Sequence, residues 1–219
     1  MARAPKHTYH HGDLRRALLD AALGLLAAQG PHGLTLREVA ERVGVTPAAM
    51  YHHFRDKEAL LAAVAEEGFV ALDRLMTEAR EAAGARPVAR LRALGKGYVA
   101  FAVAHPAHFR VMFDKLVDYH AHPTLHAAAD RTFASLLASI CEGQKAGVVR
   151  RGSAHELSLL AWSTVHGLAM LWVGCALEGP GGEAFTIEQL TDAATEMLVR
   201  GLGKSEAPAP GRARRAAAR

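Results

Sequence analysis

The chain has 219 residues, of which 50% are hydrophobic, and its formal net charge is +4. This composition provides enough apolar surface for a substantial core, which excludes a chain that is disordered throughout. The only two cysteines, Cys141 and Cys175, lie among apolar neighbours, which excludes a disulfide framework and a paired-cysteine metal site. We therefore expect a cytoplasmic protein, and its basic excess favours an anionic partner such as nucleic acid.

The two ends of the chain differ in composition from the part between them. Residues 1–11 are polar and basic and lack an apolar period, so we expect a flexible basic arm rather than a signal peptide or anchor. Residues 204–219 are biased to Ala, Pro and Arg and are expected to form a disordered basic tail. The rest is rich in helix-forming residues and poor in β-branched ones, which predicts an all-α fold.

The first two expected helices lie close together. Apolar residues recur at helical spacing over residues 13–29, and the Gly30-Pro31 pair ends this helix. A short second helix follows Thr35, because Thr35 and Glu38 have the spacing of a capping box.

A tight glycine turn is expected to follow the second helix. Gly44 provides the turn, Thr46 is a suitable N-cap, and Pro47 suits the first position of a third helix. Ala40 is small enough for two helices to cross, and Met50 is expected to point into the core. This spacing predicts a helix-turn-helix, a motif that binds DNA grooves.

The outward face of the third helix is expected to contact DNA. With Met50 and Phe54 facing inward, Tyr51 can donate to a phosphate and His52 can contact a base edge or phosphate. The alternative is that the aromatic residues are core residues, which we prefer for Phe54, and that the threonines are only caps. The expected DNA-binding residues are Thr35, Arg37, Thr46, Pro47, Ala48, Tyr51, His52 and Lys57.

Residues 35–61, TLREVAERVGVTPAAMYHHFRDKEALL, resemble the DNA-binding signature of the TetR family. The matching features are the Gly-Val turn, the Tyr51-x-x-Phe54 recognition segment and the Lys57-Glu58 pair. The resemblance implies a nine-helix dimer, in which three helices bind DNA and six bind a ligand and dimerise through the last two. It also implies a palindromic operator that is released when a ligand spreads the two DNA-binding units.

The remaining segments bring the expected total to about nine helices. Asp56 is a suitable cap for a fourth helix that continues to about Arg80 and links the two halves. Further helices are expected at residues 88–104, 106–117, 123–147, 154–178 and 186–202. We therefore expect a DNA-binding domain at residues 12–55 and a ligand-binding and dimerisation domain at residues 56–203.

Two motifs in the second half, WSTVHG at 162–167 and HPAHFRVMF at 105–113, resemble one branch of the family. Trp162, His166 and Met170 are spaced by four and share a helix face, so they could line a pocket. Core packing is the alternative for each, although a buried imidazole at His166 needs a polar partner. The expected pocket residues are Phe109, Met112, Phe113, Trp162, His166 and Met170.

Several histidines of the second half raise the possibility of a metal site, because neutral imidazoles bind zinc, copper and nickel. Their spacing does not support it: Pro123 places His122 at or before a helix start, so it does not share a helix face with His126. We expect an organic ligand and assign no metal and no cofactor. The histidines concerned are His105, His108, His120, His122 and His126.

Residues 157–177 lack Asp, Glu, Lys and Arg and are long enough to cross a bilayer. Hydroxyl side chains, His166 and two glycines interrupt this stretch, and aromatic belts are missing. We therefore expect a helix inside the protein, at a subunit interface, rather than a membrane span.

The leading interpretation is a ligand-responsive transcriptional repressor that binds a palindromic operator as a homodimer. Its partners would be double-stranded operator DNA, a small-molecule effector and a second copy of the chain. One alternative is a non-specific architectural DNA-binding protein, and another is a metal-sensing repressor that uses the histidines. An enzyme is not expected, because no nucleophile elbow, phosphate-binding loop or H-E-x-x-H helix occurs.

Overall fold

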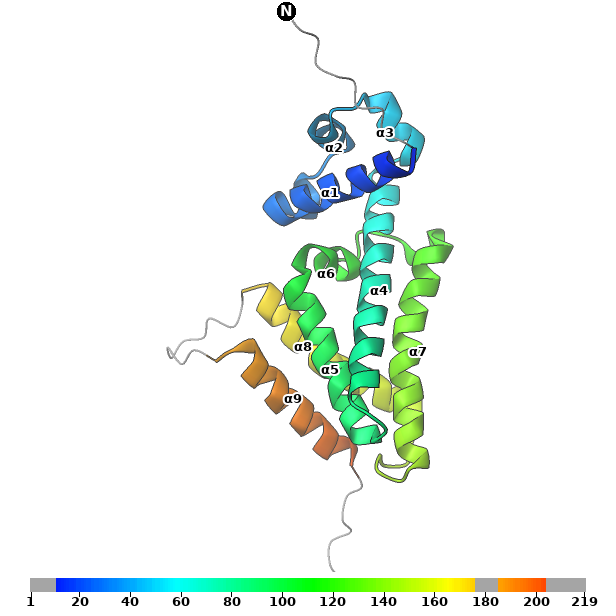
Figure 1. Cartoon of the computed structure of the whole chain (residues 1–219), viewed down its shortest axis with the longest axis vertical. Helices are drawn as coiled ribbons and strands as arrows, with labels where there is room; N and C mark the ends of the chain where they lie inside the picture. The colour runs from blue at the N-terminus through cyan, green and yellow to red at the C-terminus, as the bar shows by residue number, and fades with distance from the viewer. Residues whose placement is uncertain (1–10, 176–184, 204–219) are drawn as a thin grey trace, which may run out of the picture.

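The computed structural model describes residues 11–175 and 185–203. Within these ranges the chain forms nine α-helices, one short 3₁₀ helix and no strand, which confirms the all-α fold (Figure 1). The expected tail at 204–219 and all of the expected arm except His11 lie outside the described residues. The helices are α1 (His11–Gly33), α2 (Leu36–Val43), α3 (Pro47–His53), α4 (Lys57–Ala82), α5 (Pro87–Ala104), α6 (Pro106–Phe113), η1 (Tyr119–Ala121), α7 (Pro123–Lys145), α8 (Ala154–Val173) and α9 (Ile187–Leu202).

Helices α1, α2 and α3 form a compact unit at one end of the molecule (Figure 1). Leu18, Leu34, Val39 and Met50 are all completely buried in its core. Helix α1 extends to Gly33, beyond the expected end, but its helical path breaks at Gly30, which has φ 71°. The expected stop at the Gly-Pro pair is therefore a kink, after which one more turn brings the chain to α2.

The turn between α2 and α3 depends on a left-handed glycine. Gly44 has φ 78°, and its N–H lies 3.1 Å from the carbonyl oxygen of Glu41. The next N–H, of Val45, donates to the carbonyl of Ala40 at 2.9 Å, and Ala40 itself is only 1% exposed. These bonds satisfy the free carbonyls at the end of α2 and fix its angle to α3.

Helix α4 connects the N-terminal unit to a bundle made by the other helices. It begins beside α3 and runs down the centre of the molecule, with α7 on one side and α9 on the far side of α5 and α8 (Figure 1). It packs against α5, α6 and α7, while α5 also packs against α8 and α9. The N-terminal unit and most of the bundle share one continuous hydrophobic core.

The expected helix at 106–117 is shorter than predicted. Helix α6 ends at Phe113, and Lys115 then adopts a left-handed conformation with φ 54°. This change of direction buries Val117, which is 7% exposed, and leads into the 3₁₀ helix. No glycine or proline stands at this point, so the sequence pattern did not predict the end of the helix.

Among the described helices, only α8 is long and apolar enough to match a membrane span by length and composition. It packs against α5, α7 and α9, and Leu157, Ala161, Val165 and Ala169 on its inner side are buried. A core helix of a soluble protein has the same properties, so this helix is weak support for a membrane span.

Two glycine substitutions test the local account of the N-terminal unit. Gly44→Ala should lower the free energy of unfolding by about 1–2 kcal/mol, because a side chain opposes the left-handed conformation. Gly24→Ala, inside α1, should leave it unchanged or raise it by up to about 1 kcal/mol, since only the mobile end of Arg42 lies near the new methyl group. Urea denaturation measures both, and equal effects would contradict the role given to the turn.

Candidate functional site

One face of α3 is open to solvent, and it carries the side chains that were expected to meet DNA. Tyr51 is 57% exposed, and Pro47, Ala48 and His52 are also exposed. On the opposite side of the helix, Met50 is completely buried, and Phe54 at its C-terminal cap is 3% exposed. The inward residues therefore hold α3 in place and leave its outer face free for a partner.

The two threonine caps differ in what they still offer a partner. The backbone N–H and the hydroxyl of Thr35 both donate to Glu38 Oε2, at 2.9 and 2.8 Å. These bonds lower the pKa of Glu38, so its carboxylate is firmly held. Thr46 only accepts, from the N–H of Ala49 at 3.3 Å. Its hydroxyl proton remains available, whereas that of Thr35 is used within the cap.

The expected cations near this face are held by weak local partners. Arg37 pairs with Glu41 at 2.8 Å, and its side chain is 82% exposed. Lys57 Nζ donates to the backbone carbonyl of His32 at 3.3 Å and so ties the start of α4 to the end of α1. Exposed pairs of this kind contribute little to stability, so these side chains can exchange partners at small cost.

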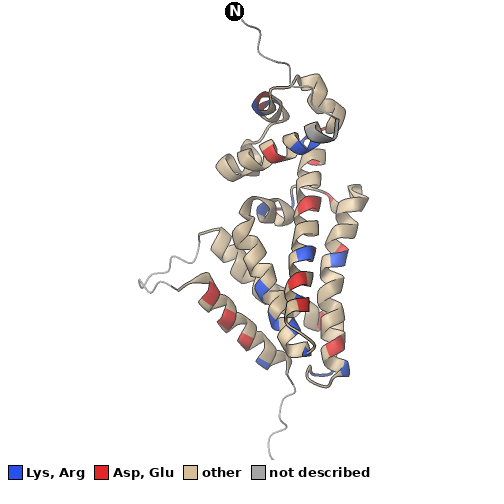
Figure 2. Cartoon of the chain, viewed as in Figure 1, with Lys and Arg blue, Asp and Glu red and all other residues tan. Residues whose placement is uncertain are grey.

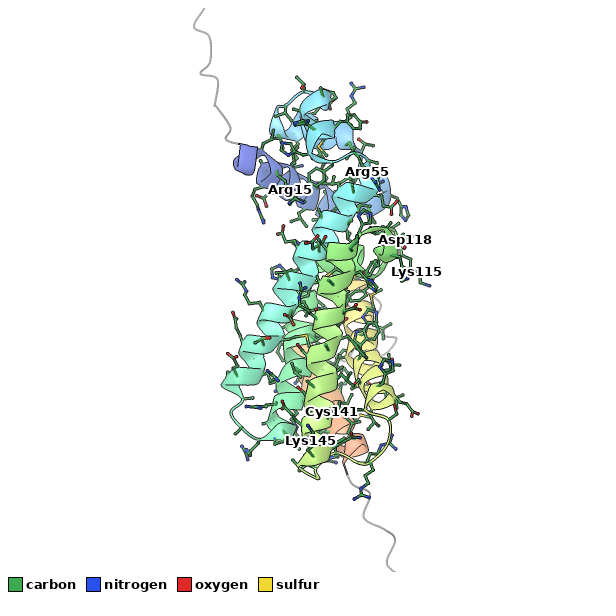
Figure 3. The ribbon with its side chains drawn as sticks, turned by 90° about the vertical axis from the view of Figure 1, so that its right-hand side faces the viewer. Arg15, Arg55, Lys115, Asp118, Cys141 and Lys145 are labelled. Atoms are coloured by element: carbon green, nitrogen blue, oxygen red, sulfur yellow. The ribbon has the colours of Figure 1, made fainter. Side chains whose placement is uncertain are left out.

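The structure adds two arginines that the sequence analysis did not single out. Arg55 lies in the turn between α3 and α4, and the guanidinium of Arg15 lies 5.3 Å from the ring centre of Phe54 (Figure 3). Arg55 pairs with Asp56 at 3.0 Å and is 72% exposed. Its place directly after the recognition segment was a usable signal, whereas the position of Arg15 depends on how α1 crosses the unit.

A cavity of about 870 Å³ lies inside the bundle, between α4, α5, α6, α7, α8 and α9. Its wall is mainly apolar and aromatic. Met112, Phe113 and Trp162, three of the six expected pocket residues, line it. Phe109 is completely buried and His166 contacts Phe113 and Trp162 by its ring, but neither is part of the lining. Met170 is 37% exposed on the outer side of α8 and does not line the cavity either.

A hydrogen-bonded group of three side chains lies at one wall of the cavity. Trp162 Nε1 donates to the hydroxyl of Tyr98 at 3.1 Å, and this hydroxyl lies 2.8 Å from Nδ1 of His166. Burial raises the pKa of Tyr98 and lowers the pKa of His166, so both side chains are neutral near pH 7. In the arrangement in which Tyr98 donates to His166, the Trp162 N–H, the Tyr98 hydroxyl and Nδ1 of His166 each have a partner. Sequence analysis missed Tyr98, because a single tyrosine in an apolar helix carries no distinctive pattern.

A second polar network connects the N-terminal unit to the bundle. Arg16 of α1 bonds to Glu67 of α4 at 3.0 Å, and His108 of α6 lies 3.6 Å from the same carboxylate oxygen. Burial lowers the pKa of His108, against the opposing attraction of Glu67. Close by, a Cβ on Gly68 would lie 2.5 Å from the sulfur of Met112, so α4 and α6 are in close contact there.

The histidines do not converge on a metal site. In the part of the chain that the structure describes, no group of three or more His, Cys, Asp or Glu side chains is placed to hold a metal ion. The rings of His120 and His126 meet edge to face with centroids 5.1 Å apart, and the ring centroid of His105 lies 5.0 Å from that of Phe101. His122 Nε2 lies 3.5 Å from a carboxylate oxygen of Glu58. They therefore occupy three separate environments.

Two family models match the chain in succession. The model for bacterial regulatory proteins of the tetR family matches residues 18–64, and the model for the tetracyclin repressor-like C-terminal domain matches residues 91–202. The second match spans more than half of the chain. The chain belongs to the TetR family of transcriptional regulators. The resemblance seen in residues 35–61 is thereby confirmed.

Relatives agree with this assignment along most of the chain. The HTH-type transcriptional regulator BetI of Cronobacter sakazakii is 28% identical over 193 residues, which cover 84% of this TetR-family chain and 88% of BetI. A solved structure of a protein of unknown function from Rhodococcus sp. RHA1 is 36% identical, covers 91% of this chain and 100% of its own, and has a TM-score of 0.79. AibR in complex with isovaleryl coenzyme A and operator DNA shares the fold, with a TM-score of 0.67, 20% identity and coverage of 84% and 97%.

The hydrogen-bonded group of Trp162, Tyr98 and His166 in this TetR-family protein should make the free energy of unfolding depend on pH. Because burial lowers the pKa of His166, its stabilising effect is present above the ordinary histidine pKa of about 6.5 and is lost as pH falls through the lowered value. His166→Phe should cost about 1 kcal/mol at pH 7, since Tyr98 loses its acceptor, and should reduce the loss of stability between pH 7 and pH 5.

Tyr98→Phe is the comparison variant, because it removes the hydrogen bond to His166, together with the one from Trp162, and keeps the imidazole. It should lower the free energy of unfolding at pH 7 by at least as much and retain the pH dependence. Some dependence should remain in His166→Phe as well, because the pKa of His108 is lowered too. Urea denaturation at the two pH values measures all three proteins. An undiminished pH dependence in His166→Phe would refute this account.

Proposed function

We propose that this TetR-family protein is a cytoplasmic repressor, rather than an enzyme, that binds a palindromic operator as a homodimer and releases it when a small molecule fills the cavity. The observation that supports this most strongly is the shared helix α4. Its first residue, Lys57, follows the turn after α3 and donates to the carbonyl of His32 in α1, and Phe69, Leu72 and Met76 further along line the cavity. A change in the cavity wall therefore acts on the element that positions the DNA-binding unit.

The exposed face of α3 supplies the contacts to the major groove in this proposal. Tyr51 and Thr46 donate hydroxyl protons to phosphates, while Ala48 and Pro47 meet thymine methyl groups and His52 meets a base edge or phosphate. Cations from flanking positions then neutralise the backbone. They are Arg37, Arg55 and Lys57, each of which leaves a weak local partner. Thr35 contributes by capping α2, because its donors are already used.

Dimerisation is proposed through the outer faces of α8 and α9. Leu160 and Leu171 on α8 are 52% and 48% exposed, and Met197 on α9 is 73% exposed. Acidic residues follow one side of α9 (Figure 2), where Asp192 and Glu196 pair with Lys96 and Arg92 of α5. The exposed apolar side chains of Leu160, Leu171 and Met197 have no such partner within the subunit. Large exposed apolar patches are typical of protein interfaces.

Release of DNA follows from the contacts of α4 in this proposal. A ligand that presses on Phe69 or Met112 displaces α4 and α6, which the Glu67 network joins to Arg16 of α1. Two recognition helices fit successive major grooves only at a spacing of about 34 Å. A small rotation of each DNA-binding unit therefore weakens both half-site contacts at once.

Selection of bound duplexes from a random pool should give a palindromic consensus with half-sites one helical turn apart. On that duplex Tyr51→Phe should weaken binding about 10-fold to 100-fold, because a hydrogen bond to a charged phosphate is lost. Tyr51→Ala should weaken it at least as much, with the dimer and its thermal unfolding unchanged. A pool without a consensus would instead favour the architectural alternative.

Loss of a phosphate contact should also appear in the salt dependence of binding. Lys57→Gln should make the negative slope of log K against log salt less steep, by about 1 for each DNA-binding unit. Arg74→Gln removes the same charge from an exposed position of the same helix and should leave the slope unchanged. If the two variants have equal slopes, Lys57 does not contact the DNA backbone.

A charge placed in the proposed interface should separate the subunits. Leu171→Glu is expected to raise the dimer dissociation constant at least 100-fold, since it buries an unpaired carboxylate. Val70→Glu is the control, because Val70 is similarly exposed, at 51%, but lies on α4. Sedimentation equilibrium measures both. A stable Leu171→Glu dimer would exclude this face as the interface.

A further inference from the structure

The tryptophan and tyrosine donors in the cavity wall are used within the protein. Trp162 Nε1 donates to Tyr98, and the Tyr98 hydroxyl in turn pairs with Nδ1 of His166. The hydroxyl of Tyr119 donates to the backbone carbonyl of Met112. Burial raises the pKa of Tyr119 to about 12, so this hydroxyl keeps its proton near neutral pH. A ligand therefore finds no free N–H or O–H on these three aromatic side chains. The imidazoles that line the cavity, His120, His126 and His155, are exposed or half-buried and lie toward its edge.

The two threonines in the wall are engaged in the same way. Thr132 donates to the carbonyl of Ala128 at 3.1 Å, and Thr195 donates to the carbonyl of Thr191 at 2.8 Å. Both threonines are at most 7% exposed. Their oxygens retain lone pairs, so they can accept a hydrogen bond from a ligand but cannot easily donate one.

Charged side chains around the cavity are confined to its edge. Lys115, Asp118, His120 and Asp130 are all exposed, and Asp130 lies 3.7 Å from Nε2 of His126. Lys115 and Asp118 lie at the end of the bundle next to the DNA-binding unit (Figure 3). The deeper wall is formed by apolar residues of α4, α5 and α7, including Leu72, Leu94, Phe133 and Leu136. No buried charge is present among the lining residues to balance a charged ligand.

We infer that the cavity selects an uncharged, largely hydrocarbon molecule whose polar group donates a hydrogen bond, as an alcohol does. This inference rests on the proposed function of the cavity as the effector site. A buried carboxylate or ammonium would lack a counter-charge, and a buried carbonyl would lack a donor, whereas a hydroxyl finds the free lone pairs of Thr132 and Thr195. The volume of about 870 Å³ is within the range of ~300–1,000 Å³ for small-molecule sites.

Four ligands with the same ten-carbon chain separate charge from hydrogen-bonding capacity. The uncharged dye N-phenyl-1-naphthylamine is bound to the full-length protein and displaced by 1-decanol, methyl decanoate, decanoate or decyltrimethylammonium. Decanol should displace the dye at a concentration at least 10-fold lower than either ion. It should also be several-fold more effective than the ester, which is more hydrophobic but can only accept hydrogen bonds. The four ligands should release the selected operator with the same order of potency, decanol being the most effective.

Two phenylalanine variants of α7 locate the binding. Ala129 lines the cavity, so Ala129→Phe should weaken dye binding at least fivefold, whereas Ala127→Phe on the exposed side of α7 should leave it unchanged. If decanoate, the ammonium or the ester equals decanol in the unaltered protein, the inferred selectivity is wrong but the effector site stands. Absent dye binding, or binding that Ala129→Phe leaves intact, would overturn both the selectivity and the proposed effector site.

Discussion

The structure depends on one continuous helix that belongs to both functional parts. Helix α4 is 26 residues long, and its N-terminus is fixed in the DNA-binding unit by the Asp56 cap, which accepts from the N–H of Ala59 at 2.7 Å. About three turns later the same helix forms the cavity wall at Phe69. An unbroken helix is stiff, so its two ends cannot move independently, and the polar contact between Arg16 and Glu67 adds a second connection to α1.

The chemistry of the two parts is correspondingly different. The exposed face of α3 presents hydroxyl and imidazole groups, and the guanidinium groups of Arg37 on α2 and Arg55 after α3 have weak local partners, as a DNA-binding surface requires. The cavity differs, because its charged side chains lie at the edge and the hydroxyl of Tyr98 at its wall is already bonded to Trp162 and His166. A surface with free donors suits phosphate, whereas a wall without them suits a hydrocarbon.

Much of the N-terminal unit was predictable from the sequence because its signals are local. Caps at Thr35 and Thr46, the turn at Gly44 and the inward pair Met50 and Phe54 all act within a few residues of the chain, and the structure has each of them. The positions of the bundle helices were also predicted well, since prolines and glycines separate them. Some helix ends were misplaced: α6 ends at Phe113, where no glycine or proline stands, and α1 continues past the break at Gly30 to Gly33.

The cavity could not be predicted in the same detail, because it depends on how six helices meet. Trp162, His166 and Met170 share a helix face by spacing, yet only Trp162 lines the cavity, His166 lies behind the wall and Met170 is exposed. An apolar helix such as α8 has one side toward its own subunit and another toward solvent or a partner. The sequence pattern shows that both sides are apolar, but not which of them encloses the space.

The most direct test of the account is the distance between the two DNA-binding units of a dimer, with the cavity empty and filled. Spin labels at Ala28→Cys, an exposed position of α1, with Cys141 and Cys175 replaced by Ser, allow pulsed electron resonance to measure it. The account predicts that saturating 1-decanol shifts the distance distribution and that Ala129→Phe reduces this response to decanol. An unchanged distribution in a protein that has bound decanol and released its operator would contradict the proposed role of α4.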